Sequence, residues 1–401
     1  MIEKTLAELT LNITDGKHGD CRGKDNSGFY FISCKDVRDG QIHYEDARQI
    51  IEEDFWDTHK RTRLEPEDIL VTNSGTIGRM AFIRDVPLTY RTTFQKSVAI
   101  VKPDKSKIFP KYLYYQLQNC VDGFVNQSNG AAQKNLLLST MRAFKMNIHE
   151  DEDTQIRIAS ILSVYDDLIE NNQKQIKLLE EAAQRLYKEW FVDLHFPGYE
   201  TTPITDGIPE GWVRYKFSEI ASIMSGGTPK TDVKEYYDGN IPFYTPKDSD
   251  GSFFAFDTIT HISKSGLDHC NSQYYPSGTV IITARGTVGK TTILAVPMAM
   301  NQSCYALKCD ELNSPYYLFF SLNKEVAALK TMANGGVFNT IIVKTFDSIH
   351  LTMPTHEVLV AFDAAISPIM DQVKVKMQQN ARLAEARDRL LPKLMNGEIE
   401  V

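Results

Sequence analysis

The stretch DILVTNSGTIGR at 68–79 returns as TVIITARGTVGK at 279–290. In both stretches a run of β-favouring residues leads into two glycines. Gly75 and Gly78 map onto Gly286 and Gly289 at one offset of 211 residues. Such a period is far too long for a solenoid repeat. The repeat therefore predicts two homologous domains that have diverged.

Further echoes keep the same order along the chain. Cys34-Lys35-Asp36 matches Pro246-Lys247-Asp248, and Asn129-Gly130 matches Asn334-Gly335, while the offset drifts from 212 to 205. Small loop insertions between two copies produce such a drift. A protein with two related halves is expected to read something that also has two halves.

Composition places limits on the class of protein. The 401 residues predict two to three domains, and 42% hydrophobic with 24% charged residues is ordinary for a soluble globular protein. A net charge of −8 argues against a free-standing DNA-binding protein, which usually carries a basic face. No apolar run reaches the length of a membrane span, and the six cysteines have no metal-binding spacing. We expect reduced thiols in a cytoplasmic protein.

Each copy is followed by a long amphipathic segment. From Ile158 to Trp190 the apolar positions step by four and three residues without a break, which predicts a coiled-coil helix of roughly 50 Å. The second segment, from Leu359 to Leu394, has a weaker stripe, and Pro368 is expected to kink or delay that helix.

Neither long helix can bury its apolar stripe alone, so the two are predicted to pack on one another in antiparallel fashion. Asn172 and Asn380 are then expected to act as polar residues that fix the register. The predicted packing residues are Ile169, Asn172, Ile176, Leu179, Ile369, Val373, Asn380 and Leu383.

The rest of each half predicts an α+β fold. Short amphipathic helices are expected at 2–9 and 214–221. Strands are expected at 29–33, 69–72, 97–101, 241–245, 280–283 and 304–307, and further helices at 110–117 and 315–322. The predicted domains are 1–150 and 213–352, the long helices lie in 151–195 and 353–401, and the linker is 196–212.

One alternative is nucleotide binding, because Ala284–Thr291 fits a relaxed P-loop pattern. Three features oppose it. The first position is Ala284 rather than glycine, the residues after Lys290 are β-branched rather than helical, and the sister copy around Asn73–Met80 has no matching lysine.

The preferred interpretation treats both glycine turns as one device that presents a hydroxyl and a cation to DNA phosphates or guanine edges; a plain turn with solvated charges is the alternative. The Asn/Gln-rich loops 126–135 and 334–339 offer groups that pair with adenine, or else are connectors. The candidate DNA-contacting residues are Lys17, Lys35, Asn73, Ser74, Thr76, Arg79, Asn129, Gln133, Lys134, Lys230, Lys247, Arg285, Thr287, Lys290 and Asn334.

Catalytic signatures are missing from the sequence. It contains no Pro-Pro dipeptide and hence no Asn/Asp-Pro-Pro-Tyr/Phe methyltransferase motif, and it contains no dinucleotide-binding, zinc-protease or nucleophile-elbow motif. His18, His59, His261 and His269 have no spacing for metal or acid–base work. The chain is therefore expected to be a non-catalytic protein without cofactor or metal.

These residues resemble the specificity (S) subunit of type I restriction–modification enzymes. LIENNQKQIKLLEEAAQRLYKEWFVDLHFPG at 168–198 resembles the central conserved region of that family, and RLLPKLMNGEI at 389–399 resembles its distal conserved region. The segments 208–212, 226–229 and 241–248 resemble the opening of its second recognition domain. The first recognition domain matches least, since Asp15–Asp20 replaces the Ser-Gly-Gly-Thr-Pro pattern.

The resemblance implies two target-recognition domains separated by two long antiparallel coiled-coil helices. Each domain would read half of a split, asymmetric site in double-stranded DNA. Two methyltransferase (M) subunits would carry the chemistry, and restriction/translocase (R) subunits would join them. A P-loop ATPase, a coiled-coil scaffold that binds no DNA, and a type II-like partner enzyme remain as alternatives.

Overall fold

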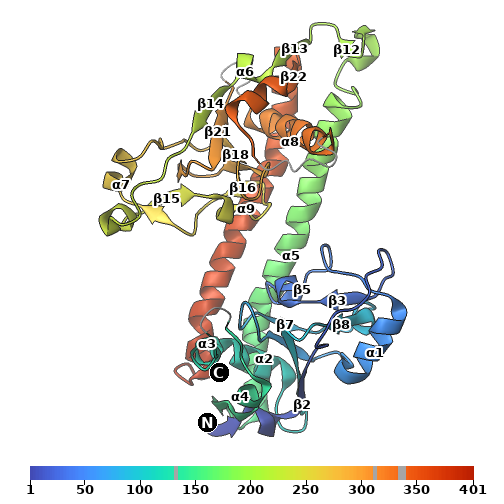
Figure 1. Cartoon of the computed structure of the whole chain (residues 1–401), viewed down its shortest axis with the longest axis vertical. Helices are drawn as coiled ribbons and strands as arrows, with labels where there is room; N and C mark the ends of the chain where they lie inside the picture. Colours follow the sequence, from blue (N-terminus) through green and yellow to red (C-terminus); the bar gives the residue numbers. More distant parts are fainter. Residues whose placement is uncertain (131–133, 310–313, 333–339) are drawn as a thin grey trace. The chain divides into compact units, whose positions relative to one another are not determined.

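The computed structural model describes residues 1–130, 134–309, 314–332 and 340–401 (Figure 1). The chain forms two compact units. Unit 1 comprises Met1–Ile169 and Arg382–Val401, and unit 2 comprises Glu170–Ala381.

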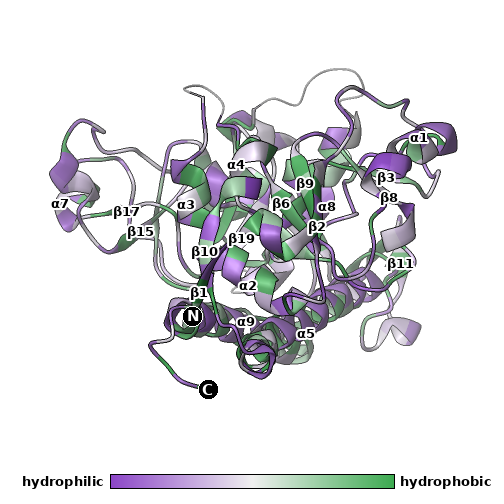
Figure 2. Ribbon diagram, turned by 90° about the horizontal axis from the view of Figure 1, so that it is seen from below, coloured by the Kyte–Doolittle hydropathy of each residue, from purple (hydrophilic) through white to green (hydrophobic). Residues whose placement is uncertain are grey.

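Unit 1 is built on a four-stranded antiparallel sheet with strand order β2-β9-β6-β7. Its strands are β2 (Thr10–Asp15), β9 (Val98–Pro103), β6 (Ile69–Thr72) and β7 (Met80–Phe82). All four residues of β6 are buried. A short apolar run of this kind suits a central strand covered on both faces, and Figure 2 colours β6 and β9 as largely hydrophobic.

The other elements of unit 1 surround this sheet (Figure 1). The strand pairs are β1 (Ile2–Thr5) with β10 (Lys145–Ile148), β3 (Tyr30–Ile32) parallel to β8 (Thr92–Phe94), and β4 (Val37–Arg38) with β5 (Gln41–Ile42). The helices and 3-10 turns are η1 (Leu6–Leu9), η2 (Cys34–Asp36), α1 (Glu52–Thr62), η3 (Thr89–Arg91), α2 (Pro110–Asn119), α3 (Val121–Asn126) and α4 (Leu138–Ala143).

Unit 2 repeats this plan. Its main sheet has strand order β14-β21-β18-β19-β16, from β14 (Ser222–Ser225), β21 (Cys304–Lys308), β18 (Val280–Thr283), β19 (Thr291–Leu294) and β16 (Phe254–Ala255). A second sheet contains β17 (His261–Ile262), β15 (Ile241–Tyr244) and β20 (Ala299–Met300). Two further antiparallel pairs are β13 (Val213–Lys216) with β22 (His350–Met353), which are distant in sequence, and the hairpin of β11 (Ile204–Thr205) with β12 (Ile208–Pro209).

Unit 2 also contains helices and 3-10 turns, and its sheets match those of unit 1. The helices and turns are η4 (Tyr199–Thr201), α6 (Phe217–Ile220), η5 (Lys234–Tyr237), η6 (Pro246–Asp248), α7 (Lys264–Asp268), α8 (Pro315–Met332) and η7 (Val343–Ser348). The order β14-β21-β18-β19 matches β2-β9-β6-β7, and the parallel pair β15–β20 matches β3–β8. The two homologous α+β units predicted from the repeat are confirmed.

Two 40-residue helices follow the sheets: α5 (Glu152–Phe191) and α9 (His356–Met395). Within unit 2, the side chain of Asn172 bonds to Asn380, and the Trp190 ring lies 5.8 Å from that of Phe362. Residue numbers rise on one helix as they fall on the other, so the segments are antiparallel, as predicted. Figure 2 shows hydrophilic and hydrophobic residues interspersed along both helices.

Unit 1 contains its own antiparallel segment of the two helices. Nη1 of Arg387 on α9 donates to Oδ1 of Asp166 on α5 at 2.7 Å. The other carboxylate oxygen accepts from the hydroxyl of Tyr115 on α2 at 2.6 Å. Asp166 therefore ties both long helices to the globular part of unit 1.

Pro368 does not delay the helix, because α9 begins at His356 and is helical through the proline to Met395; the predicted kink stays a prediction. A proline inside a helix leaves the carbonyl four residues earlier without its donor. That carbonyl belongs to Ala364, and both Ala364 and Pro368 lie on the exposed face of α9. Water can replace the missing donor there.

The two opening helices were predicted too long. Ile2–Thr5 forms β1 and Val213–Lys216 forms β13, and only Leu6–Leu9 and Phe217–Ile220 are helical. The strands form because each finds a partner much later in the chain, β10 or β22. A period of two over four residues is too short to show this in the sequence.

The other predicted elements are confirmed, and the ends of the predicted strands differ from the observed ones by at most two residues. Helix α8 extends well past 322, and the helices α1, α3 and α4 were not predicted. In the predicted linker, β11 and β12 form a small hairpin, and Phe196 is buried in the core of unit 2.

Candidate nucleic-acid interface

The first glycine turn closes the end of β6 in unit 1. The Thr72 N–H donates to the Arg79 carbonyl at 2.8 Å, and the Gly78 N–H donates to the Thr72 carbonyl at 2.9 Å. The Thr72 hydroxyl donates to the Thr76 carbonyl and accepts from the Arg79 N–H at 2.9 Å. The buried Thr72 hydroxyl thus bonds to two backbone groups of the turn and stabilises it.

The second turn, at the end of β18 in unit 2, has the same bonds. The Thr283 N–H donates to the Lys290 carbonyl at 2.9 Å, and the Gly289 N–H donates to the Thr283 carbonyl at 2.8 Å. The Thr283 hydroxyl donates to the Thr287 carbonyl and accepts from the Lys290 N–H at 3.0 Å. The two turns therefore share one backbone structure.

The second glycine of each turn packs against a helix. Gly78 and Gly289 have φ angles of 87° and 73°, which favour glycine. A Cβ atom on Gly78 would lie 2.6 Å from Cγ1 of Val121, and one on Gly289 would lie 2.7 Å from Cγ1 of Val326. Both the conformation and the close approach require glycine.

The nucleotide-binding alternative is contradicted at the second turn. A P-loop places its lysine at the N-terminus of a helix, whose amides surround the phosphates. Lys290 is followed directly by strand β19 (Thr291–Leu294), which pairs with β18. The turn is a β-hairpin connection.

The same backbone positions carry different side chains in the two units. Asn73 and Ala284 each follow the last strand residue, and each accepts a backbone hydrogen bond from a distant segment. The Leu136 N–H donates to the Asn73 carbonyl at 2.8 Å, and the Ile341 N–H donates to the Ala284 carbonyl at 2.9 Å. The two turns thus have the same backbone structure but carry different side chains.

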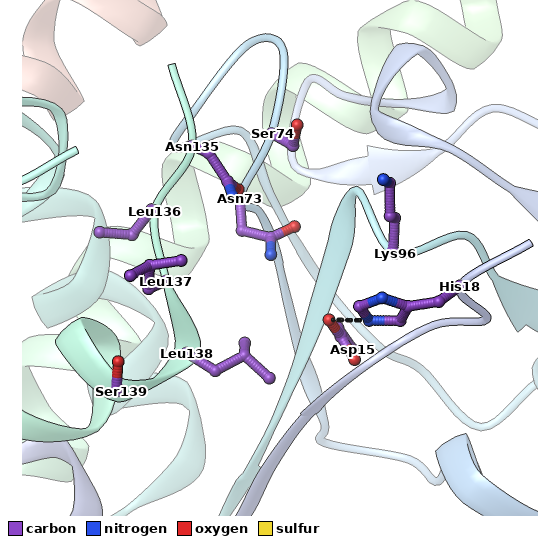
Figure 3. A pocket seen from close by; sticks show the side chains of 10 residues that line it. All are labelled: Asp15, His18, Asn73, Ser74, Lys96, Asn135, Leu136, Leu137, Leu138 and Ser139. Atoms are coloured by element: carbon purple, nitrogen blue, oxygen red, sulfur yellow. Dashed lines mark hydrogen bonds and ion pairs between the residues drawn. The ribbon is translucent and has the colours of Figure 1, made fainter. Parts of the chain in front are cut away.

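A cavity of about 440 Å³ lies beside the turn of unit 1. It is lined by Asp15, His18, Asn73, Ser74, Lys96 and the segment 135–139. In Figure 3 the Asn73 carboxamide points into the space between Leu138 and Lys96. Asn73 is 4% exposed, and its Oδ1 has no hydrogen-bond partner among the described residues.

Asp15 forms the charged side of this cavity. It is buried, and its carboxylate accepts from Nη2 of Arg61 at 2.5 Å and lies 2.9 Å from Nε2 of His18 (Figure 3). The sequence did not single out Asp15, His18 or Lys96 as site residues. For Lys96 the sequence held a signal, because it follows Gln95, which matches Gln302 in the second copy.

Other predicted residues of unit 1 lie around the same end of the sheet. Lys17 has its Nζ 3.3 Å from Oδ2 of Asp57, so its charge already has a partner. Asn129 exchanges two backbone hydrogen bonds with Asn135, a residue of the cavity wall. Lys35, Thr76, Arg79 and Lys134 are exposed. Gln133 lies outside the described residues.

In unit 2 the turn meets η6. The Thr287 hydroxyl donates to the Pro246 carbonyl at 3.3 Å, and Arg285, Thr287 and Lys247 are exposed. The structure thus brings the 285–287 turn and the loop of Lys247 together. Lys230 is exposed in the loop after β14, and among the described residues no hydrogen bond or ion pair joins its side chain to the turn. Asn334 lies outside the described residues.

Lys290 belongs to a different surface from Arg285. It lines a groove of about 540 Å³ between the hairpin, α8 and the unit 2 part of α5, together with Lys324 and Lys330. Nζ of Lys330 donates to the Gly289 carbonyl at 3.3 Å. Burial, and then the neighbouring Lys290, lower the pKa of Lys330. The groove is therefore basic.

All the predicted packing residues of the long helices are buried or partly buried. Val373 is fully buried, Asn172 is 8% exposed, and Ile176, Leu179 and Ile369 pack against the core of unit 2. Ile169, Asn380 and Leu383 are partly buried.

Among the described residues, no group of three or more His, Cys, Asp or Glu side chains is arranged to hold a metal ion. All six cysteines are free. No helix in the described part of the chain is both long and apolar enough to cross a membrane.

Comparisons with known proteins agree with this architecture. The type I restriction modification DNA specificity domain matches twice, over residues 20–181 and 209–385. The chain is 24% identical over 366 residues to the HindI specificity subunit of Haemophilus influenzae, covering 75% of this chain and 80% of that protein. It is 24% identical over 343 residues to the MjaIX specificity subunit of Methanocaldococcus jannaschii, covering 83% and 78%.

A solved structure is similar in fold. The crystal structure of the S subunit of a type I restriction-modification system from M. genitalium aligns with a TM-score of 0.55 and 14% identity, covering 98% of this chain and 96% of that one. Specificity subunits are DNA-recognition components rather than catalytic ones. The two domain matches cover most of the sequence, and the chain therefore belongs to the family of type I restriction-modification specificity subunits.

Proposed function

We propose that the chain reads a split, asymmetric site in double-stranded DNA, with each unit reading one half-site. The observation that carries this proposal is that the glycine turns of the two units share one backbone structure but differ in their side chains. Asn73, Ser74 and Arg79 of unit 1 correspond to Ala284, Arg285 and Lys290 of unit 2. Identical frames with different side chains suit the reading of two different half-sites, and hence a non-palindromic target.

The candidate contacts divide into two kinds. Arginine pairs with guanine through two hydrogen bonds, and asparagine pairs with adenine, so Arg285 and Asn73 suit base reading. Lysines such as Lys35, Lys134, Lys247 and Lys290 suit phosphates, which position the protein without reading sequence. Because the net charge is −8, partner subunits are expected to supply much of the phosphate neutralisation.

The long helices are the proposed site for partner subunits, which would be two methyltransferase subunits and the restriction/translocase subunits. Large apolar side chains stay exposed along α5 and α9, and apolar surface of this kind marks interaction sites. They are Val164 (57%), Leu168 (46%), Leu178 (65%), Val360 (53%) and Val375 (45%). A DNA-reading complex of this kind would act in the cytoplasm, and the chain itself would need no cofactor.

The decisive experiment maps adenine methylation across the genome in cells carrying this chain with its neighbouring methyltransferase. The expected result is a split, asymmetric motif that disappears when the chain is deleted. A matched strain with an inactive methyltransferase is the control. If an active methyltransferase leaves no motif that depends on this chain, the proposal is wrong.

Exchanging residues 1–150 for those of a homologue separates DNA reading from a scaffold role. We expect the exchange to change one half-site and leave the other intact. A coiled-coil scaffold would instead keep its function without any change of motif. Whether the partner is a type I or a type II-like enzyme depends on the chemistry of another chain, and the cleavage pattern of the assembled complex distinguishes them.

A further inference from the structure

The cavity of unit 1 contains a polar group that lacks a partner. Asn73 is 4% exposed, and its Oδ1 is buried without a hydrogen bond among the described residues. Buried polar groups in folded proteins are nearly always bonded, and an unbonded one is costly. Its position on the wall of an open cavity of about 440 Å³ suits an incoming ligand that supplies the missing bond (Figure 3).

The chemistry of a carboxamide limits what that ligand can be. Asparagine presents one acceptor and one donor side by side. In the major groove only adenine presents an acceptor next to a donor on one base, its N7 and N6 amino group. Guanine presents two acceptors, cytosine a donor, and thymine an acceptor beside a methyl group.

We propose that Asn73 is the specificity-determining residue of unit 1 and that it recognises an adenine in the half-site read by that unit. This inference rests on the proposed DNA-reading function. Because Oδ1 is buried, the side chain has to turn so that its two amide atoms face the base edge together. Lys96, across the cavity from Asn73 in Figure 3, supplies a cation for a flanking phosphate.

The second unit supplies an internal comparison. Ala284 holds the equivalent position, with the same backbone bond to a distant segment, and its side chain has no polar atom. Unit 2 therefore cannot read adenine from this position. The comparison also shows that alanine is compatible with the turn, so Asn73→Ala is expected to fold.

The test uses the full chain with its methyltransferase partner and the variants Asn73→Ala and Asn73→Asp. Asn12→Ala is the matched control, because Asn12 is an exposed asparagine of β2 in the same unit. The methylated motif is mapped for each variant. Affinity is measured on duplexes carrying each base pair at each position of the half-site, and melting temperatures verify folding.

For Asn73→Ala, one adenine position of one half-site is expected to lose its discrimination, about tenfold or more in the wild type, while the other half-site stays unchanged. Asn73→Asp, which is nearly isosteric, is expected to shift preference at that position to cytosine, since a carboxylate accepts from the N4 amino group. Asn12→Ala should keep the wild-type motif.

Two results would overturn the inference. One is an unchanged motif for folded Asn73→Ala and Asn73→Asp. The other is an equal loss of affinity across all sequences, which would make Asn73 a structural or phosphate-contacting residue. In both cases a wild-type motif that depends on the chain would leave the proposed function standing, whereas the absence of any such motif would refute that function itself.

Discussion

The side-chain amide of Asn172 on α5 donates to Oδ1 of Asn380 on α9 at 2.9 Å, and Asn172 is 8% exposed. This pair lies on the stripe along which the two helices pack, and a misaligned register would break the hydrogen bond between the two amides. Polar pairs in coiled coils fix register at a cost in stability.

Replacing one member of the pair should therefore destabilise the protein. Asn172→Leu is expected to lower the free energy of unfolding by about 1–3 kcal/mol, because Asn380, which is partly buried, loses its hydrogen bond from Asn172. Urea unfolding of the purified chain measures this. Asn171→Leu, at the exposed neighbouring position, is the control and should change stability by less than about 0.5 kcal/mol.

The double variant Asn172→Leu/Asn380→Leu provides a second readout. Because it removes both amides of the pair, it should recover most of the lost stability. If the double variant is as unstable as the sum of the two single variants, the pair is not coupled and its role in fixing register is refuted.

The glycine that packs on a helix should tolerate no side chain. Gly289→Ala combines a strained φ of 73° with a Cβ only 2.7 Å from Val326, and we expect a loss of about 2–4 kcal/mol. Gly278→Ala is the matched control: it has a φ of 87° but nothing within 4 Å of the new Cβ, so only the conformational cost remains. Equal losses in the two variants would show that contact with α8 is unimportant.

Glu180 on α5 should make stability depend on pH. Burial raises its pKa to about 7, opposed by a hydrogen bond with the Phe253 backbone. Because the folded pKa exceeds the unfolded one, the folded state binds the proton more tightly, and stability is lost as the pH rises from about 4.5 to about 7. We expect a loss of about 1–2 kcal/mol after discounting for partial exposure.

The variant Glu180→Gln replaces the titrating carboxyl group with a neutral amide. It should flatten the dependence of stability on pH between about 4.5 and about 7. At pH 8 it should be more stable than the wild type. Glu181→Gln, at the partly exposed neighbouring position, is the control. The measurement is urea unfolding between pH 5 and pH 8. A wild-type profile that remains parallel to that of Glu180→Gln would contradict the assignment.

The two cations of the second turn should affect DNA binding in different ways. Arg285→Ala is expected to weaken binding by about 1–3 kcal/mol and to relax one base position, if Arg285 pairs with guanine. Lys290→Ala, in the groove beside α8, is expected to weaken binding equally for all sequences and to reduce the salt slope by about one. Titrations of the assembled complex at several salt concentrations distinguish these outcomes.

An equal effect of Arg285→Ala on every sequence would make Arg285 a phosphate contact. If Lys290→Ala leaves both affinity and salt slope unchanged, the groove lined by Lys290, Lys324 and Lys330 does not face DNA.

The sequence by itself determined the duplication, the two glycine turns and the helical stripe. Each of these depends on local rules: Gly78 and Gly289 need positive φ angles, β6 and β18 are runs rich in β-branched residues, and the apolar positions of the helices repeat every three or four residues. Such patterns can be read from neighbouring residues alone. The exclusion of a P-loop also followed locally, from the β-branched residues after Lys290.

Tertiary structure alone decided which side chains meet. Asp15, Asn73 and Lys96 converge because β2 and β6 both pair with β9, and nothing local in the sequence fixes that register. It also made Ile2–Thr5 a strand through a partner more than 140 residues away. It placed Pro368 on the exposed face of α9, where the carbonyl without a helical donor is open to solvent, and it directed Arg285 and Lys290 to different surfaces. These outcomes depend on pairing between segments that are distant in sequence, which many weak contacts stabilise together. Short sequence patterns do not encode that pairing.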